Sequence, residues 1–190
     1  MDIILEKIKE FADKAHGDQK RKYTPERYIV HPVRVMKLCQ EYTSSIPILA
    51  AALLHDVLED TNVTRNDLHD FPINLMVRKD AERTIYLVIE LTDTYTKSNF
   101  PGWNRRKRKH KEALRIEQTS AEAQTIKYAD IIDNCNEIAV QDPEFAPVFL
   151  RECKMLLEKM PKGNELMYKK AMESVIRNLK QVLHNNASKK

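Results

Sequence analysis

Apolar residues recur at helical spacing along most of the chain. Ile4, Ile8 and Phe11 follow one another at intervals of three or four residues, and Val35 and Leu38 repeat the interval farther on. Such intervals place apolar side chains on one face of an α-helix, whereas a strand shows strict alternation of apolar and polar residues. No segment alternates convincingly. The pattern therefore predicts an all-α fold.

The most apolar part of the chain is residues 46–58, IPILAAALLHDVL. It is apolar almost all round, which is typical of a central helix that its neighbours cover on most sides. Thr64 and Asp67 are spaced like a helix start, and apolar residues at helical intervals through 81–92 predict that a long helix occupies this region. Residues 94–104, TYTKSNFPGWN, contain turn formers without periodicity and predict a loop.

Further helices are expected in the second half of the chain. Ser120 stands where it can cap a helix over residues 121–139. Pro143 then interrupts the pattern, and two more helices are expected over roughly 147–160 and 164–184. No internal repeat and no linker separates these segments, so we expect residues 1–190 to form a single domain.

Composition supports a helix-rich protein with a packed core. Hydrophobic residues make up 42% of the 190 residues and charged residues 32%, with only 3 glycines. This balance excludes low-complexity and fibrous classes. The three cysteines, Cys39, Cys135 and Cys153, are odd in number and form no CxxC pair, which argues against a disulfide framework.

The chain shows no sequence feature of export or membrane insertion. Its first residues, MDIILEKIKEF, are interrupted by charges, unlike a signal peptide. The longest apolar stretch, residues 46–54, is far shorter than the roughly 20 residues that span a bilayer. We therefore expect a cytoplasmic protein without a membrane partner.

Positive charge is concentrated in one place. The basic segment, residues 105–111 (RRKRKHK), holds six Lys or Arg residues and no acid, and leaves 26 basic against 28 acidic residues elsewhere. A solvated helix face is one interpretation of this segment and a phosphate-binding surface is another. A nucleic-acid surface is disfavoured, because few aromatic residues apart from Trp103 accompany it and the rest of the chain is slightly acidic.

Four ionisable residues follow the apolar run of the central helix. In HDVLEDT, a helix would place His55 one turn from Glu59 and Asp56 one turn from Asp60. A solvated helix end would explain such a cluster in isolation. Directly after an apolar run, however, burying these groups without a cation would be costly.

Other candidate ligands lie far away in the sequence. His31 stands in YIVHPV, and Asp130 stands in IKYADIIDN, where Lys127 and Asn134 share its helix face. Two imidazoles and two carboxylates suit manganese, iron or zinc with positions left for water and substrate. A surface carboxylate is the alternative for Asp130.

The order of these residues resembles that of the HD-domain metal-dependent phosphohydrolases. The surrounding sequence resembles the RelA/SpoT-type guanosine tetraphosphate hydrolases over about residues 10–140. The similar segments are AHGDQKRKYTPERYIVHPVRV, AAALLHDVLEDTNVT, the pair Leu91-Thr92, and IKYADIIDN. The resemblance implies an HD-domain helical bundle and a small, stand-alone alarmone hydrolase, since the chain has no room for the other domains of the long members.

The resemblance also implies roles for individual residues. One metal ion, expected to be manganese with zinc or iron as alternatives, would be bound by His31, His55, Asp56 and Asp130. Glu59 and Asp60 match the catalytic acidic pair that positions and activates the attacking water and handles protons. The residues expected to contact the nucleotide or its phosphates are Arg21, Lys22, Lys127, Asn134, Arg105, Arg106 and Lys107.

The sequence departs from this family at three places. YTPER fills the gap where a Gly-containing turn is usual, Ile131 stands where Arg is usual, and Asp133 stands where His is common. These departures leave the predicted metal ligands intact. They affect the positions at which the family contacts the nucleotide.

The predicted activity is removal of the 3′-diphosphate from guanosine tetra- or pentaphosphate, (p)ppGpp, to give GDP or GTP and pyrophosphate. One alternative is another HD-type nucleotide phosphohydrolase, such as a nucleotidase or a 3′-phosphatase. A second alternative is a nucleotide- or nucleic-acid-binding module without catalysis, against which the acidic pair Glu59 and Asp60 argues. Three questions stay open: whether the substrate carries guanine or adenine, whether NADPH is also hydrolysed, and which oligomeric state the protein adopts.

Overall fold

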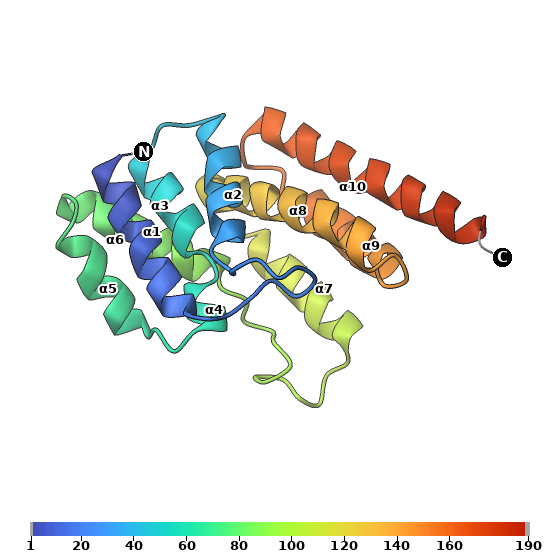
Figure 1. Cartoon of the computed structure of the whole chain (residues 1–190), viewed down its shortest axis with the longest axis horizontal. Coiled ribbons are helices and arrows are strands. Elements are labelled where there is room, and N and C mark those ends of the chain that lie inside the picture. Colours follow the sequence, from blue (N-terminus) through green and yellow to red (C-terminus); the bar gives the residue numbers. More distant parts are fainter. Residues whose placement is uncertain (1, 189–190) are drawn as a thin grey trace. The chain divides into compact units, whose positions relative to one another are not determined.

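The computed structural model describes residues 2–188 and is built from α-helices (Figure 1). Within this range it contains no strand, and the only β-type pairing is an isolated antiparallel bridge between Lys20 and Arg27. The prediction of an all-α fold is therefore confirmed. The chain divides into two compact units, unit 1 (Met1–Thr92) and unit 2 (Asp93–Lys190). The single-domain arrangement stays a prediction.

Unit 1 is arranged around a short apolar helix, α3, which packs against α1, α2 and α6 (Figure 1). Every residue of α3 from Ile48 to Leu54 is buried, as its uninterrupted apolar sequence predicts. The helices of this unit are α1 (Ile3–His16), α2 (Val30–Gln40), α3 (Ile46–Leu54), α4 (Val57–Asp60), α5 (Arg65–Ile73) and α6 (Arg78–Leu91).

The first helix shows how local sequence sets the helix ends in unit 1. The Asp2 carboxylate accepts a hydrogen bond of 2.7 Å from the backbone N–H of Ile4 and caps the N-terminus of α1. Gly17 ends the helix with φ +55°, a left-handed conformation that glycine adopts without a steric cost. The chain then leaves α1 for the loop that leads to α2.

The central helix differs from its prediction. A continuous helix over 46–58 was expected, but α3 ends at Leu54 and α4 begins at Val57. Between them Asp56 has φ −97° and ψ −6°, near the bridge region, which interrupts the regular helical hydrogen-bond ladder. His55 and Asp56 therefore lie on a turn between two helices.

The long helix expected between residues 64 and 92 is also divided, into α5 and α6. Thr64 and Asp67 form a reciprocal capping box at the start of α5, as their spacing predicts. Pro72 has no N–H to donate and weakens the last turn of that helix. The backbone N–H groups of Leu75 and Met76 bond instead to the carbonyl of Pro72, which closes the turn before α6.

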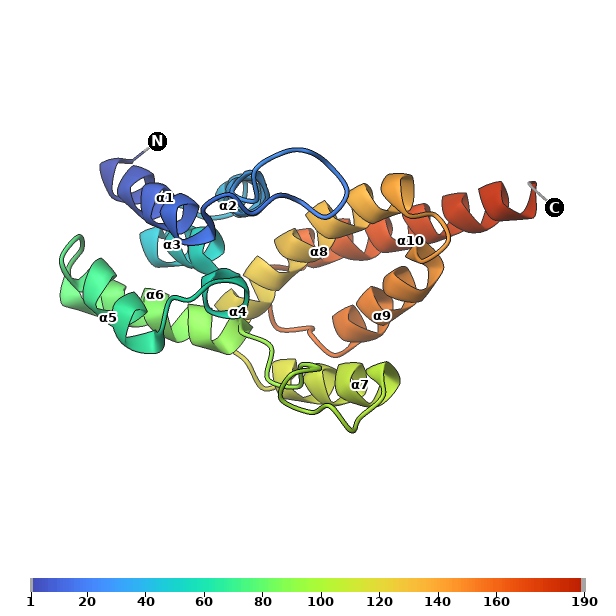
Figure 2. The same ribbon diagram turned by 60° about the horizontal axis from the view of Figure 1, so that its bottom comes forward.

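Unit 2 contains α7 (Arg105–Ile116), α8 (Ala121–Gln141), α9 (Ala146–Glu158) and α10 (Glu165–Ala187). The loop predicted over 94–104 is free of helix, and Ser120 caps α8 by accepting from the N–H of Ala123 at 3.2 Å. Helices α8 and α10 lie side by side in both ribbon views, with α9 against both (Figure 2).

One glycine is needed where α10 approaches α8. A Cβ atom at Gly163 would lie 2.9 Å from the backbone nitrogen of Thr125 and would overlap the ring of Tyr128. The Gly163 N–H donates to the hydroxyl of Tyr128 at 3.1 Å, and Asn164 then caps α10. This close approach sets how the turn before α10 packs on α8.

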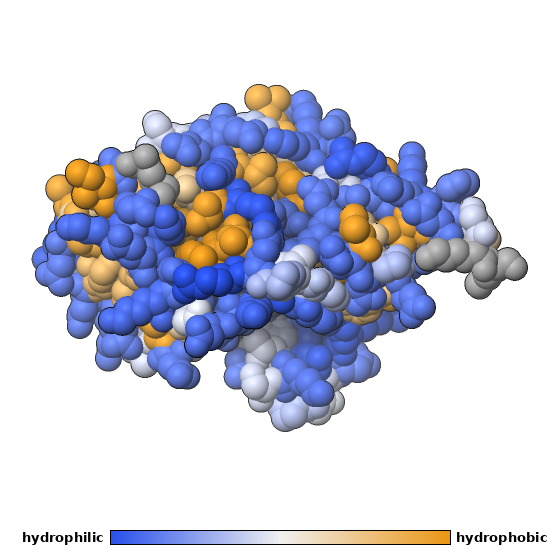
Figure 3. Space-filling view, viewed as in Figure 1, coloured by the Kyte–Doolittle hydropathy of each residue, from blue (hydrophilic) through white to orange (hydrophobic). Residues whose placement is uncertain are grey.

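The surface is largely hydrophilic and the cysteines are free, as the composition predicts. Hydrophilic side chains cover most of the face shown in Figure 3, and apolar side chains form separate groups on it. The three cysteines are buried free thiols. Among residues 2–188, no helix combines the length and the apolar character needed to cross a membrane.

Candidate active site

Two histidines and one aspartate converge in unit 1. His31 lies in the first turn of α2, while His55 and Asp56 form the turn between α3 and α4. Their potential ligand atoms all lie within 4.8 Å of one another. Nε2 of His31 is 3.6 Å and Nε2 of His55 is 3.1 Å from Oδ2 of Asp56. We call these three residues the His–His–Asp cluster.

The backbone orients the ring of His55. Its Nδ1 lies 2.9 Å from the carbonyl oxygen of Ala52, and a carbonyl only accepts hydrogen bonds. Nδ1 therefore carries a proton, and Nε2 is the ring nitrogen that faces Asp56 and could bind a metal. A hydrogen bond from the second ring nitrogen to a carbonyl is the usual way of orienting a metal-binding histidine.

The chemistry of the cluster fits a divalent metal. Both imidazoles are almost fully buried, with exposed fractions of 1% and 2%. An imidazole nitrogen and a carboxylate oxygen can both donate an electron pair, so a metal cation bound between them would offset the cost of burying these groups. Two nitrogen donors and one oxygen donor suit manganese, iron or zinc.

Tyr28 connects the cluster to Asp60. Its hydroxyl lies 2.7 Å from Oδ2 of Asp56 and 2.8 Å from Oδ2 of Asp60. Because a phenol carries one proton, it donates to one carboxylate at a time. The ring stacks on the buried imidazole of His16, with centroids 4.4 Å apart, which restricts the orientation of the phenol. Tyr28 is the first residue of the YIVHPV motif, which points to His31 as a ligand but gives no sign that the tyrosine contacts Asp56 and Asp60.

The ionisation of Tyr28 and Asp60 responds to their surroundings. Burial, followed by the charges of the two aspartates, raises the pKa of Tyr28, so the phenol stays protonated and remains a donor. Partial desolvation and the charge of Asp56 raise the pKa of Asp60 above the usual aspartate value, although the hydrogen bond from Tyr28 opposes this rise. A carboxylate with a raised pKa is a better proton acceptor.

The other predicted residues of unit 1 have different surroundings. Glu59 lies on α4, where its N–H donates to the carbonyl of Asp56 at 3.1 Å. The guanidinium of Arg21 lies 5.5 Å from the ring centre of Tyr28. Lys22 donates a hydrogen bond of 2.7 Å to the hydroxyl of the neighbouring Tyr23.

Three predicted residues of unit 2 interact with one another on one face of α8. Nζ of Lys127 lies 2.8 Å from Oδ2 of Asp130, and Nδ2 of Asn134 donates to Oδ1 of Asp130 at 2.5 Å. They line a pocket of about 150 Å³ together with Phe149 and Cys153 of α9. Asp130 belongs to unit 2 and the His–His–Asp cluster to unit 1, so its place as the fourth metal ligand stays a prediction.

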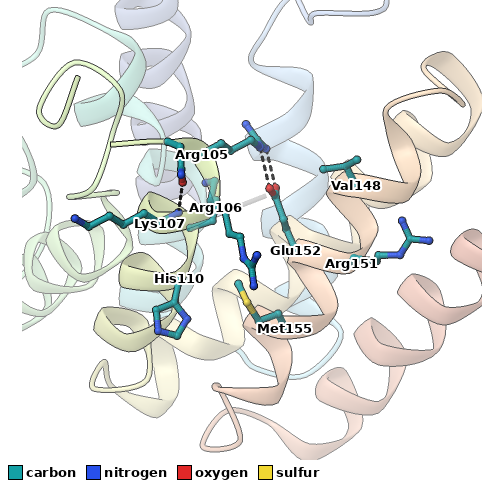
Figure 4. Close-up of a pocket in the computed structure, with 10 residues that line it drawn as sticks. Arg105, Arg106, Lys107, His110, Val148, Arg151, Glu152 and Met155 are labelled. Atoms are coloured by element: carbon teal, nitrogen blue, oxygen red, sulfur yellow. Dashed lines mark hydrogen bonds and ion pairs between the residues drawn. The ribbon is translucent and has the colours of Figure 1, made fainter. Parts of the chain in front are cut away.

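The three predicted residues of the basic segment have different surroundings at the start of α7. Arg105 forms a bidentate ion pair with Glu152 of α9, at 2.8 and 2.7 Å. Lys107 holds its Nζ 4.1 Å from the ring centre of Trp103. Arg106 lines a larger pocket between α7 and α9 (Figure 4).

Two acidic residues that no sequence pattern singles out hold together this part of unit 2. Glu152 pairs with Arg105 although 47 residues separate them. Glu112 is buried in α7 and accepts hydrogen bonds of 3.0 and 2.9 Å from the N–H groups of Thr94 and Tyr95. Nothing in the local sequence distinguishes these two from ordinary helix-surface acids, because their partners come from other segments.

Comparisons with known proteins agree with the geometry of unit 1. The family model described as "HD domain" matches residues 28–135, which include the His–His–Asp cluster and Asp130. The guanosine-3′,5′-bis(diphosphate) 3′-pyrophosphohydrolase MESH1 of Homo sapiens is 32% identical over 142 residues, which are 71% of this chain and 69% of that protein.

A longer bacterial relative matches as well. The probable guanosine-3′,5′-bis(diphosphate) 3′-pyrophosphohydrolase of Mycoplasma pneumoniae is 26% identical over 160 residues, covering 83% of this chain. The chain spans only 21% of that protein and 9% of the matching Aquifex aeolicus pyrophosphohydrolase.

A solved structure shares the fold. It is that of a metazoan ortholog of SpoT that hydrolyzes ppGpp and plays a role in starvation responses. It matches with a TM-score of 0.74 and 24% identity, over 94% of this chain and 98% of that one.

Proposed function

Because this chain belongs to the HD domain family, we propose that it is a metal-dependent hydrolase that removes the 3′-diphosphate from (p)ppGpp. The products would be pyrophosphate and GDP or GTP. The observation that carries this proposal is the convergence of His31, His55 and Asp56 within 4.8 Å, in a chain whose human relative is named for this reaction.

We assign the metal to His31, His55 and Asp56, with Asp130 as a fourth ligand. Manganese is the proposed ion, on the resemblance to the RelA/SpoT-type hydrolases and on the mixed nitrogen and oxygen donors. The buried Nδ1–H of His55 supports the assignment, because its bond to Ala52 directs the other nitrogen toward Asp56. When bound, such an ion lowers the pKa of coordinated water and polarises phosphoryl oxygens.

The acidic residues would manage the proton of the attacking water. Hydrolysis adds water across the bond between the ribose O3′ and the neighbouring phosphorus, so the water loses a proton and O3′ gains one. Glu59 and Asp60 are assigned to orient the water and carry this proton. The raised pKa of Asp60 supports a role in proton transfer. Tyr28 would keep the Asp60 carboxylate beside Asp56 through its hydroxyl.

Cationic and amide side chains would bind the nucleotide. Arg21 and Lys22 are assigned to the purine and the phosphates near the cluster, and the position of Arg21 beside the Tyr28 ring supports this. Lys127 and Asn134 are assigned to the substrate because both line the pocket that contains Asp130. Arg105, Arg106 and Lys107 are assigned to the phosphates as a group.

The test is a substrate panel assayed with purified protein loaded with Mn²⁺. We expect release of pyrophosphate and GDP from ppGpp, with no release by the same protein in excess chelator. Orthophosphate released from 3′- or 5′-monophosphates, with ppGpp left intact, would instead identify a phosphatase or nucleotidase. Tight nucleotide binding without any turnover would identify a binding module and overturn the proposal.

A further inference from the structure

Two of the three cysteines contact each other inside unit 2. Cys135 lies on α8 and Cys153 on α9, and a side-chain hydrogen bond joins their thiols. This bond, together with burial, raises the pKa of Cys135, so its thiol stays protonated. The third cysteine, Cys39, belongs to α2 of unit 1. We call Cys135 and Cys153 the thiol pair.

The hairpin formed by α8 and α9 places the thiol pair at one level. Cys135 lies six residues before Gln141, the last residue of α8, and Cys153 lies seven residues after Ala146, the first residue of α9. At a rise of about 1.5 Å per residue, these positions are about 9 Å and about 10.5 Å from the turn. The two helices run in opposite directions from this turn and pack against each other (Figure 2). The contact between the cysteines therefore follows from the geometry of two regular helices.

The two thiols differ in their access to small molecules. Cys135 is 0% exposed, whereas Cys153 is 6% exposed and lines the pocket of about 150 Å³ that contains Asp130. This volume has room for a few small molecules, since one water occupies about 30 Å³. Hydrogen peroxide is about the size of two waters and can reach Cys153 from the pocket. Cys153 is therefore the thiol that meets such an oxidant first.

Joining the two sulfurs would change the wall of this pocket. An S–S bond is about 2.05 Å long, whereas non-bonded atoms in contact are about 3.5–4.0 Å apart. Bond formation would therefore draw the Cys153 sulfur away from the pocket and toward α8. Asn134, which directly precedes Cys135 on α8, donates a hydrogen bond of 2.5 Å to Asp130. Because packed interiors transmit small displacements, a shift of Cys135 would reach the amide that orients Asp130.

We propose that Cys135 and Cys153 form a reversible disulfide on oxidation by a hydroperoxide, and that this disulfide reshapes the Asp130 pocket and slows turnover. The Cys153 sulfur attacks one peroxide oxygen and becomes a sulfenic acid, while the other oxygen leaves as water with the thiol proton. The Cys135 sulfur then displaces the hydroxyl group from the sulfenic acid, which leaves as a second water with the Cys135 proton. Two thiols lose two electrons to the peroxide, and a dithiol reductant reverses the change. The effect on turnover rests on the proposed function, whereas the disulfide and the change of the pocket do not.

The first measurement detects the disulfide in the unmodified chain. Reduced protein is treated with hydrogen peroxide, its remaining thiols are blocked, and its tryptic peptides are weighed by mass spectrometry. Trypsin cleaves after Lys127, Arg151 and Lys154, so the two cysteines fall on different peptides. We expect one linked pair of peptides, lighter by two hydrogen atoms than the separate thiol peptides, which dithiothreitol separates again. Oxidation that stops at sulfinic acid on Cys153, or that leaves both thiols free, would overturn the proposal.

Three single variants test the effect on turnover, each compared with its own reduced form. After peroxide treatment the parent should hydrolyse ppGpp about tenfold more slowly or less, since a displacement of about 1 Å in a site can cost up to about 10²-fold. Cys135→Ala and Cys153→Ala should form no linked peptides and should lose several-fold less turnover. Cys39→Ala is the matched control, because it removes a buried thiol from unit 1 and should respond to peroxide as the parent does.

A spectroscopic measurement separates failure of this inference from failure of the proposed function. The side-chain amide of Asn134 gives its own NMR signals, which should shift when the disulfide forms and return on reduction, even if no ppGpp is hydrolysed. Such a reversible shift in a protein without hydrolysis would support the inference and overturn the proposed function alone. Unchanged Asn134 signals in fully linked protein, or unchanged turnover in a linked protein that hydrolyses ppGpp, would overturn the inference and leave the function standing.

Discussion

The hydroxyl of Tyr28 lies 2.7 Å from Oδ2 of Asp56, although 28 residues separate them in the chain. The same hydroxyl lies 2.8 Å from Asp60, so one phenol orients a proposed metal ligand and a proposed catalytic acid together. Stacking on His16 restricts where the phenol can point. Tyr28 is thus a positioning residue whose loss should disturb metal binding as well as turnover.

Tyr28→Phe keeps the ring and removes the hydroxyl. We expect metal affinity to fall by roughly 10-fold or more, as is typical when an outer partner of a metal ligand is lost. Titration of the metal-free variant with Mn²⁺ checks this independently of activity. Tyr86→Phe is the matched control, because Tyr86 is 52% exposed on α6. Equal affinities for the two variants would show that the hydroxyl does not support the cluster.

His55→Ala and Asp56→Ala should each abolish stoichiometric metal binding and hydrolysis. Removing one donor opens the coordination shell and leaves the remaining buried donors without their shared cation. Metal content measured after dialysis against Mn²⁺ provides the check, with circular dichroism to confirm that the helices persist. His69→Ala serves as the control, since His69 is an exposed histidine elsewhere in unit 1. Full turnover by either cluster variant in excess chelator would refute the metal assignment.

Glu59→Gln separates proton handling from binding. The amide keeps the size of the side chain but loses its charge and basicity, so turnover should fall by roughly 10²-fold or more, a typical contribution of a general acid or base. Metal content and KM should stay near the parent values. A variant that loses its metal instead would mean that Glu59 is a ligand, and the roles of the acidic residues would have to be exchanged.

Gly163→Ala tests the packing of the turn before α10. The added methyl group would overlap Tyr128 and crowd the backbone of Thr125, so we expect destabilisation of about 1–3 kcal/mol, as for other overpacking substitutions. Urea unfolding monitored by circular dichroism measures the change. Gly102→Ala makes the same chemical change where no atom lies within 4 Å of the new methyl group. A stability loss shared equally by both variants would contradict the steric explanation.

Local interactions in this protein were readable from the sequence. The capping box of Thr64 and Asp67, the Ser120 cap of α8 and the shared face of Lys127 and Asp130 each join residues three positions apart. Helical periodicity and capping depend on such short separations, so the local sequence is enough to predict them. Motif resemblance added His31, His55 and Asp56 as candidate ligands, which the structure brings within 4.8 Å.

Tertiary structure alone decided the relationships between distant segments. The hydroxyl of Tyr28 contacts Asp56, and Arg105 pairs with Glu152, only because segments from different parts of the chain pack together. The break after Leu54 likewise departs from an apolar pattern that predicts an uninterrupted helix. Such contacts depend on the packing of whole helices. The local sequence around a residue therefore does not predict which distant side chain the residue will contact.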